Sequence, residues 1–166
     1  MKFADVSAGV SLFLDANTLI YHFTPEPDLG PLCRTLIDRI ARQEIAGFTS
    51  AHVLSNIAHR LMTLEAMSLL GWPAAGIASR LKRHHAEVRN LHRYRLAIDE
   101  VAAMGIHVMA ITQSMVVRAA ALSQQHELLS GDALVVAAMQ SARIVHVASH
   151  DSDFDRVPGI IRYAPV

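Results

Sequence analysis

The sequence predicts an α/β fold with a mostly parallel central sheet and helices on both of its faces. Short apolar runs bounded by turn residues alternate with helical patterns along the chain, which is typical of repeated strand, helix, strand units. The length of 166 residues and the hydrophobic content of 52% fit one domain with a sizeable core. No internal repeat or linker divides the sequence, so residues 1–166 predict a single domain.

The first half of the chain contains two predicted strands and two predicted helices. Ser50 is placed to cap the second helix, which Gly71 and Pro73 end. The expected elements are a strand at 11–14, a helix at 31–45, a strand at 47–50 and a helix from Ser50 to Leu70.

The second half begins with a long helical pattern. Residues 77–104 lack Gly and Pro and carry apolar residues at steps of three and four, which predicts one long helix or a helical hairpin. Thr112 is placed to cap the helix after the next strand. The remaining expected elements are a strand at 107–111, helices at 116–126 and 131–142, and strands at 144–148 and 160–163.

Composition excludes several classes of protein. The single cysteine, Cys33, and the lack of a signal-like or membrane-spanning apolar segment predict a cytoplasmic protein without a membrane association. The sequence holds no P-loop, no dinucleotide-binding glycine motif, no cysteine pair for zinc and no nucleophile elbow. The net charge of zero argues neither for nor against a nucleic-acid partner.

The charge is unevenly distributed, because residues 80–95 are strongly basic. This segment holds five arginines, one lysine and three histidines against one acid, Glu87. It lies within a helical elaboration of the domain at about residues 73–104. Two interpretations remain open: a surface that binds the nucleic-acid backbone, or a solvated helical face.

Four aspartates each come after a short apolar run, and such runs predict buried strands. They are Asp15 in VSLFLDANTLI, Asp132 in LLSGDALVVAAM, and Asp151 with Asp153 in IVHVASHDSDFDRV. Ligands bind outside the carboxyl ends of parallel strands, so we expect the four carboxylates to converge there. Their mutual repulsion is relieved by a hard cation, Mg²⁺ or Mn²⁺, which predicts metal-assisted phosphoryl chemistry.

Each aspartate also has a structural explanation. Asp15 is placed to cap a helix that starts at Asn17 and Thr18. Asp132 fits the first turn of a helix, and Asp151 fits an Asx turn. The joint placement of all four at one sheet edge favours the metal site, and the sequence does not choose between Asp151 and Asp153.

The segments LDANTLI, LLSGDALVVAAM and ASHDSDFDRVPGI, in this order, resemble the PIN-domain ribonucleases, in particular toxins of the VapC type. The resemblance implies a three-layer α/β/α sandwich and a metal-dependent endoribonuclease. It implies that Asp15, Asp132, Asp151 and Asp153 bind the metal and carry catalysis. It also implies an antitoxin partner and a homodimer. Residues placed to orient the carboxylates or a metal-bound water are Asn17, Thr18 and Ser149.

The sequence departs from the family at one position. TSAHVLSNIAHRL aligns with a family segment that usually carries Glu, and the corresponding residue is Asn56. An amide oxygen can contact a hard cation but brings no charge, so weaker metal binding is expected. His52 and His59 share a helix face with Asn56, either as softer ligands or, as we favour, as surface or dimer contacts.

An acidic site repels an anionic substrate, so cations elsewhere must hold the RNA. We expect Lys82, His85, Arg89 and Arg93 to form this RNA-binding set as one helical stripe. Two other functions remain open. One is a degenerate PIN domain that binds RNA or protein without catalysis, suggested by Asn56, and the other is a carboxylate phosphatase or flap-type DNA nuclease.

Overall fold

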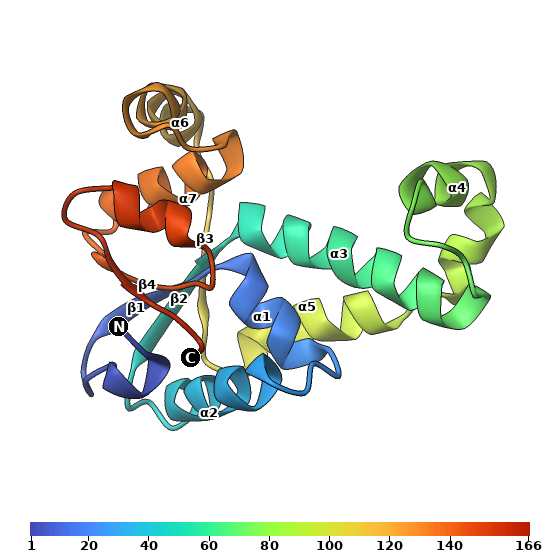
Figure 1. Cartoon of the computed structure of the whole chain (residues 1–166), viewed down its shortest axis with the longest axis horizontal. Helices are drawn as coiled ribbons and strands as arrows, with labels where there is room; N and C mark the ends of the chain where they lie inside the picture. The colour runs from blue at the N-terminus through green and yellow to red at the C-terminus, as the bar shows by residue number, and fades with distance from the viewer.

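A computed structural model describes all 166 residues and contains a five-stranded sheet whose neighbouring strands all run parallel (Figure 1). The strand order is β3-β2-β1-β4-β5. The strands are β1 (Ser11–Leu14), β2 (Ala46–Ser50), β3 (His107–Met109), β4 (His146–Ala148) and β5 (Ile161–Tyr163). The predicted α/β/α fold is therefore confirmed, with a sheet that is wholly rather than mostly parallel.

Helices cover both faces of this sheet, as parallel strands with right-handed crossovers require. In Figure 1, α6 and α7 lie on one side, and α1, α2 and α5 on the other. The longer helices are α1 (Ala16–Phe23), α2 (Leu29–Ala41), α3 (Ala51–Leu70), α5 (Arg93–Ala103), α6 (Gln113–His126) and α7 (Ser130–Ser141). None of the helices combines the length and apolar character needed to cross a membrane.

The core is centred on β1, because this strand is covered on both faces. Leu12, Phe13 and Leu14 have no exposed surface, which explains their continuous apolar run. Gly47 in β2 lets α2 pack closely, since a Cβ there would lie 2.7 Å from the Ile40 side chain. The carboxyl end of β1 lies where the chain turns from β2 and β3 back to β4, the usual position of a ligand site.

Capping residues set the ends of α3. The Ser50 side chain accepts a hydrogen bond from the Val53 N–H at 3.3 Å, as predicted from the sequence. Gly71, at a φ of 64°, ends the helix in the left-handed conformation that glycine favours. Thr112 caps α6 in the same way as Ser50, through the Met115 N–H.

The elaboration after α3 differs from the prediction. Residues 77–104 form neither one long helix nor a simple hairpin, but α4 (Ile77–Arg83), the 3₁₀ segment η2 (His85–Asn90) and α5. His84 leaves helical geometry at φ −116° and ψ 53°, and Leu91 is extended. The expected single stripe of Lys82, His85, Arg89 and Arg93 is therefore wrong, because these residues lie on three separate elements.

Two short 3₁₀ turns complete the chain. The 3₁₀ turns η1 (Phe3–Asp5) and η3 (Ser152–Arg156) precede β1 and follow β4, respectively. Figure 1 shows α4 at the far end of α3, away from the sheet. The elaboration is thus carried outward by α3, whereas η3 stays at the sheet edge and holds Asp153.

Candidate metal centre

The carboxyl ends of β1 and β4 lie side by side. Leu14 pairs with Ala148, and the next residue, Asp15, donates its N–H to the Ala148 carbonyl at 3.1 Å. Thr18 donates its hydroxyl to the same carbonyl at 2.9 Å. Asp15 and Ser149 therefore leave neighbouring strands at the same level of the sheet.

Asp15 is held by three hydrogen bonds. Its carboxylate accepts from the Ala16 N–H at 2.7 Å, the Asn17 amide at 2.6 Å and the Ser149 hydroxyl at 2.7 Å. Burial raises the pKa of this carboxyl, while the bonds from Ser149 and Ala16 act in the opposite direction. Asp15 also caps α1, as its structural explanation predicts, while its role in binding a metal stays a prediction.

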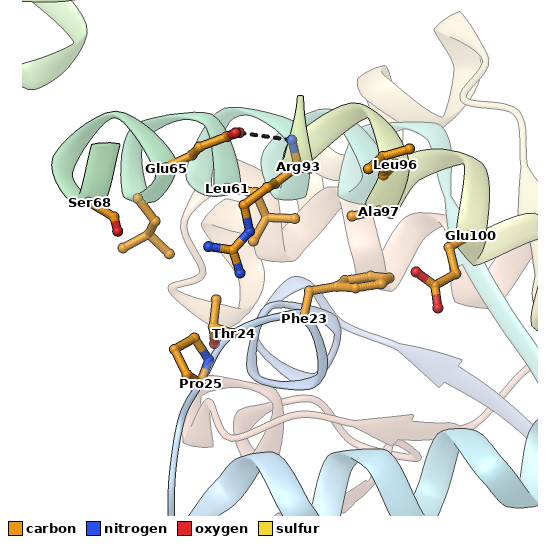
Figure 2. A pocket seen from close by; sticks show the side chains of 11 residues that line it. Phe23, Thr24, Pro25, Leu61, Glu65, Ser68, Arg93, Leu96, Ala97 and Glu100 are labelled. Carbon is orange, nitrogen blue, oxygen red and sulfur yellow. Dashed lines mark hydrogen bonds between the residues drawn. The ribbon is translucent and has the colours of Figure 1, made fainter. Parts of the chain in front are cut away.

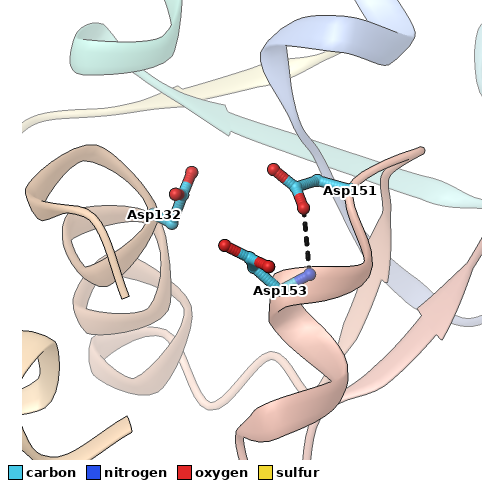
Figure 3. Close-up of side chains that lie close together, drawn as sticks. All are labelled: Asp132, Asp151 and Asp153. Atoms are coloured by element: carbon cyan, nitrogen blue, oxygen red, sulfur yellow. Dashed lines mark hydrogen bonds between the residues drawn. The ribbon is translucent and has the colours of Figure 1, made fainter. Parts of the chain in front are cut away.

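The other three aspartates form a compact group (Figure 3). Asp132 lies in the first turn of α7, Asp151 precedes η3, and Asp153 lies within η3. Each offers a carboxylate oxygen, and these oxygens lie within 4.8 Å of one another. Asp151 also accepts the Asp153 N–H at 2.9 Å, which forms the predicted Asx turn and fixes the two carboxylates relative to each other.

The electrostatics of this group reflect crowding. The pKa of Asp132 is raised to about 6, first by burial and then by repulsion from Asp15, Asp151 and Asp153. Asp15 is therefore electrostatically part of the site, although its oxygens are engaged in hydrogen bonds. The carboxylates present the hard oxygen donors that Mg²⁺ and Mn²⁺ prefer, so the donor set fits such an ion.

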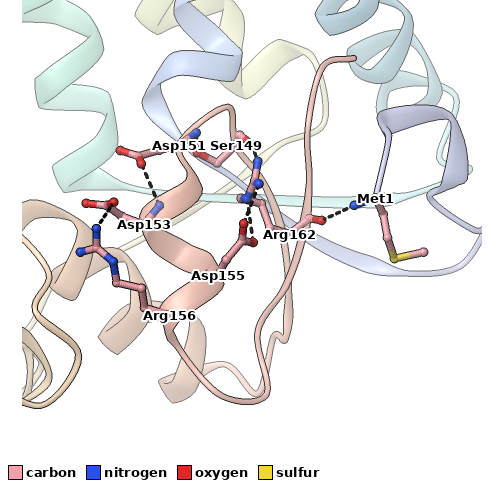
Figure 4. Close-up of polar contacts among 7 residues, drawn as sticks. All are labelled: Met1, Ser149, Asp151, Asp153, Asp155, Arg156 and Arg162. Carbon is pink, nitrogen blue, oxygen red and sulfur yellow. Dashed lines mark hydrogen bonds and ion pairs between the residues drawn. The ribbon is translucent and has the colours of Figure 1, made fainter.

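One arginine side chain, that of Arg156, contacts the acidic group (Figure 4). Arg156 lies 2.8 Å from an Asp153 oxygen and donates to the Glu127 carbonyl at 2.9 Å, which links η3 to the loop before α7. Arg156 is not among the residues predicted from the sequence, although its position three residues after Asp153 is a usable signal. The neighbouring Asp155 faces elsewhere and pairs with Arg162 at 2.7 Å, which lowers the pKa of Asp155.

A buried network supports the carboxylates. The Ser149 hydroxyl donates to Asp15 and accepts from the Asp151 N–H and the Asn17 amide, both at 3.0 Å. Asn17 in turn accepts the His150 N–H at 2.9 Å. Thr18 differs from the expectation of a carboxylate-orienting residue, because its hydroxyl donates to a backbone carbonyl and reaches no carboxylate. Its role is to hold the strand end beneath Asp15.

Asn56 lies on the first turns of α3, outside the three-carboxylate group. Its side-chain nitrogen is 3.2 Å from His52 Nε2. That imidazole nitrogen is also 3.5 Å from where a Cβ on Gly131 would lie, so His52 is next to the residue that precedes Asp132. The start of α3 therefore borders the acidic site, whereas the His59 side chain is exposed to solvent.

Comparison with protein families now identifies the fold. The PIN domain family model matches residues 12–160. The chain belongs to the PIN domain family. A comparison with curated protein sequences gives no significant match. The predicted family is confirmed, and the matched residues include all four aspartates of this PIN domain.

Solved structures share the PIN fold with this chain at low sequence identity. VapBC2 from Rickettsia felis, bound to a promoter DNA fragment, has a TM-score of 0.61 at 12% identity, covering 93% of this chain and 98% of its own. The sarcin-ricin loop cleaving toxin VapC20 from Mycobacterium tuberculosis has 0.60 at 17%, covering 87% and 93%. A toxin-antitoxin complex from Klebsiella pneumoniae has 0.52 at 20%, covering 91% and 96%. At these identities the likeness concerns the fold alone.

The PIN domain also contains a pocket that holds none of the four aspartates (Figure 2). It has a volume of about 370 Å³ and lies between α1, α3 and α5. Glu65, on its wall, is only 8% exposed and accepts the N–H groups of His92 and Arg93, both at 3.0 Å. Glu65 thus caps α5 and lies outside the acidic group.

The predicted RNA-binding residues divide between two places. Lys82, His85 and Arg89 are exposed on α4 and η2, at the far end of α3. Arg93 begins α5, and its side chain extends into the pocket beside Leu61 and Thr24 (Figure 2). Arg93 therefore lines the pocket, whereas the other three lie on α4 and η2.

Proposed function

We propose that this PIN domain is a Mg²⁺- or Mn²⁺-dependent endoribonuclease that hydrolyses RNA phosphodiester bonds as the toxin of a toxin-antitoxin pair. The observation that carries the proposal is the convergence of Asp132, Asp151 and Asp153, with oxygens within 4.8 Å, beside the buried Asp15. Carboxylates packed so closely repel one another and favour a divalent cation. The PIN domain match supports nuclease chemistry at this position.

Asp132, Asp151 and Asp153 would hold the cation, with Asp15 adding charge from beneath. A bound divalent cation supplies a nucleophilic water at neutral pH and stabilises charge on the phosphodiester. Ser149 and Asn17 keep the Asp15 carboxylate oriented, and the Asp151 N–H bond to Ser149 fixes the start of η3. No side chain needs to form a covalent intermediate.

RNA binding is assigned to Lys82, His85 and Arg89, with Arg93 contributing from the start of α5. Cations outside the acidic site are needed because RNA is a polyanion, and each phosphate contact releases counterions. The cytoplasm supplies this substrate, and the single buried Cys33 fits a reducing compartment.

An antitoxin partner and a homodimer complete the proposal. Toxin-antitoxin complexes are named among the proteins of similar fold, which supports the partner by analogy. Light scattering of the isolated chain measures its oligomeric state. Co-expression with the neighbouring open reading frame tests the partner through recovery of growth.

A second candidate is a non-catalytic domain that binds RNA or protein, and Asn56 favours it. The amide brings no charge where the family usually has Glu, and its nitrogen is directed to His52 rather than to the acidic group. In this case the aspartates would bind a cation without cleavage of RNA.

Cation binding and RNA cleavage by matched variants test the nuclease proposal. We expect Mn²⁺ binding in calorimetry by the wild type and strong weakening in Asp132→Asn. Asp155→Asn is the matched control, since it removes one charge from the same 3₁₀ turn but pairs with Arg162. Cleavage of RNA by wild type and Asp155→Asn but not by Asp132→Asn supports the enzyme. Equal rates for all three would remove it.

A further inference from the structure

Arg156 connects the two segments that carry the acidic group. It lies in η3, and one of its terminal nitrogens is 2.8 Å from an Asp153 oxygen (Figure 4). The other terminal nitrogen donates to the Glu127 carbonyl at 2.9 Å, five residues before Asp132. No other hydrogen bond or ion pair joins η3 to residues 127–132. Among the polar contacts, this side chain alone relates the position of Asp153 to that of Asp132.

The turn that carries Glu127 is itself well fixed. Glu127 has a φ of 55° and ends α6 in the left-handed conformation, where its N–H donates to the Ser123 carbonyl. The Ser123 hydroxyl donates to the Leu128 carbonyl at 2.7 Å, and Leu128 is buried in the core. The helix α7 begins two residues later. The Glu127 carbonyl is therefore a fixed point from which Arg156 can set the place of Asp153.

The side of η3 that faces the sheet is held separately. Arg162 in β5 pairs with Asp155 at 2.7 Å and donates to the Ser149 carbonyl at 3.2 Å (Figure 4). These contacts attach the 3₁₀ turn to the sheet and do not reach Asp153. The two arginines therefore have different roles, and the contact of η3 with the segment before α7 is left to Arg156.

The ion pair formed by Arg156 and Asp153 should contribute little to folding. The two side chains are 49% and 29% exposed, and solvent screens such pairs. A planar guanidinium that binds two acceptors nevertheless fixes their relative position, because its donors form a rigid fork. A lysine ammonium is a point charge on a flexible chain, so it would keep the charge without the fork. The arginine thus supplies geometry more than stability.

The spacing of the carboxylates decides which divalent cation the group prefers. Mg²⁺ requires a nearly ideal octahedron of oxygens at about 2.0–2.1 Å, whereas Ca²⁺ accepts about six to eight oxygens at about 2.3–2.6 Å in variable geometry. Carboxylates repel one another and move apart unless something holds them. A mobile Asp153 would let the group open and accommodate Ca²⁺, whereas a fixed Asp153 favours the smaller ion.

We propose that Arg156 is a positioning residue of the metal centre, which holds Asp153 close to Asp132 and thereby selects Mg²⁺ or Mn²⁺ against Ca²⁺. The inference rests on the metal-dependent site of the proposed function, and it assigns the ion selectivity to a residue outside the carboxylate group. Arg156 acts through the carboxylate that it binds. Loss of a partner of this kind typically lowers metal affinity by about 10–100-fold.

Competition between ions in matched variants tests the inference. Arg156→Lys keeps the charge and removes the fork, and Arg156→Gln removes both. Arg118→Lys is the control, because this exposed arginine joins α6 to the far end of α7 through the Gln140 side chain at 2.7 Å. Electron paramagnetic resonance of free Mn²⁺ measures binding, and displacement by Mg²⁺ and by Ca²⁺ gives the affinity ratio of these two ions. Urea unfolding with a chelator checks that each metal-free variant is folded.

We expect both Arg156 variants to move the ratio of Mg²⁺ to Ca²⁺ affinity toward Ca²⁺ by about fivefold or more, while Arg118→Lys keeps the wild-type ratio. A contact that only supports the fold would change the unfolding transition and leave the ratio unaltered. An unaltered ratio in Arg156→Lys overturns the inference. An equal rise in affinity for both ions in Arg156→Gln also overturns it, because Arg156 would then act only as a charge.

RNA cleavage by the same proteins separates this inference from the nuclease proposal. If the ratio shifts as expected but no protein cuts RNA, the nuclease proposal fails and the role of Arg156 holds. If RNA is cut and the ratio does not shift, the nuclease proposal holds and the role of Arg156 fails. If the wild type binds no Mn²⁺, both fail.

Discussion

Ser149 donates its hydroxyl to the Asp15 carboxylate at 2.7 Å and so joins the residue after β4 to the residue after β1. Both side chains are buried, and the same hydroxyl accepts the Asp151 N–H at 3.0 Å. One side chain therefore connects the aspartate at the first strand with the acidic loop 136 residues later, since Asp151 follows Asp15 by that count.

Ser149→Ala is expected to destabilise the protein by about 1–3 kcal/mol, because it leaves buried acceptor and donor groups without their partner. Urea unfolding of the metal-free protein measures this change. Ser141→Ala is the control, since this exposed hydroxyl only donates to the Ala138 carbonyl in its own helix and should change stability by less than about 0.5 kcal/mol. Similar losses in both variants would contradict a special role for Ser149.

The raised pKa of Asp132 predicts a pH dependence of metal-free stability. The folded-state pKa of about 6 exceeds the ordinary value of 3.8, so the protonated form favours folding. This contribution is fully present below about pH 4 and is lost as the pH rises through 6. At pH 7, Asp132→Asn should therefore be more stable than wild type, by about 1 kcal/mol because solvent screens the repulsion at this half-buried carboxyl.

Thermal or urea unfolding at pH 4 and pH 7 with a chelator measures this effect. Asp155→Asn should behave in the opposite way, because Arg162 lowers the pKa of Asp155 in the folded state. Mn²⁺ should stabilise the wild type at pH 7 and leave Asp132→Asn nearly unchanged. If the stability of the metal-free wild type relative to Asp132→Asn increased with pH, the carboxylates would not be repelling one another.

Glu65→Gln is expected to loosen the start of α5 and lower stability by about 1–3 kcal/mol. The carboxylate uses both oxygens to accept the His92 and Arg93 N–H groups, whereas an amide has one acceptor oxygen. Hydrogen exchange at these two amides measures the local effect, and urea unfolding the global one. Glu100→Gln, an exposed change on the same helix, serves as control. Unaltered exchange at both amides would show that Glu65 is not the cap.

The sequence predicts the sheet edge well, because its signals are local. An apolar run followed by Asp15 or by Ser149 marks a strand end, and parallel pairing then brings these ends together. The caps at Ser50 and Thr112 are equally local and are confirmed. The convergence of the aspartates follows from this topology, while their catalytic role stays a prediction.

The elaboration shows where such reasoning fails. Apolar residues at steps of three and four continue through residues 77–104, yet helical geometry breaks at His84 and Leu91. The start of α5 depends on Glu65, which is 27 residues before His92 and so invisible to a local pattern. The arrangement of Lys82, His85, Arg89 and Arg93 was wrong for this reason, since a stripe assumes an unbroken helix.

Asn56→Glu separates the enzyme from the non-catalytic domain. A carboxylate at this position, next to His52 at the start of α3, adds a negative charge on the border of the acidic group, so Mn²⁺ affinity should rise by about tenfold or more. If the acidic group is a working but under-charged site, RNA cleavage should rise with it. Ser55→Glu is the matched control, because it adds the same charge one residue away on another exposed part of the helix.

The measurement compares wild type, Asn56→Glu, Ser55→Glu and Asp132→Ala on one RNA across a Mn²⁺ titration. Cleavage by the Asp132→Ala protein reports any contaminating nuclease. Faster cleavage by Asn56→Glu alone indicates that the missing charge limits the natural protein. If Mn²⁺ binds more tightly to Asn56→Glu while its cleavage stays at the Asp132→Ala level, the cation site is intact but catalysis is lost. The non-catalytic binding domain would then be the correct function.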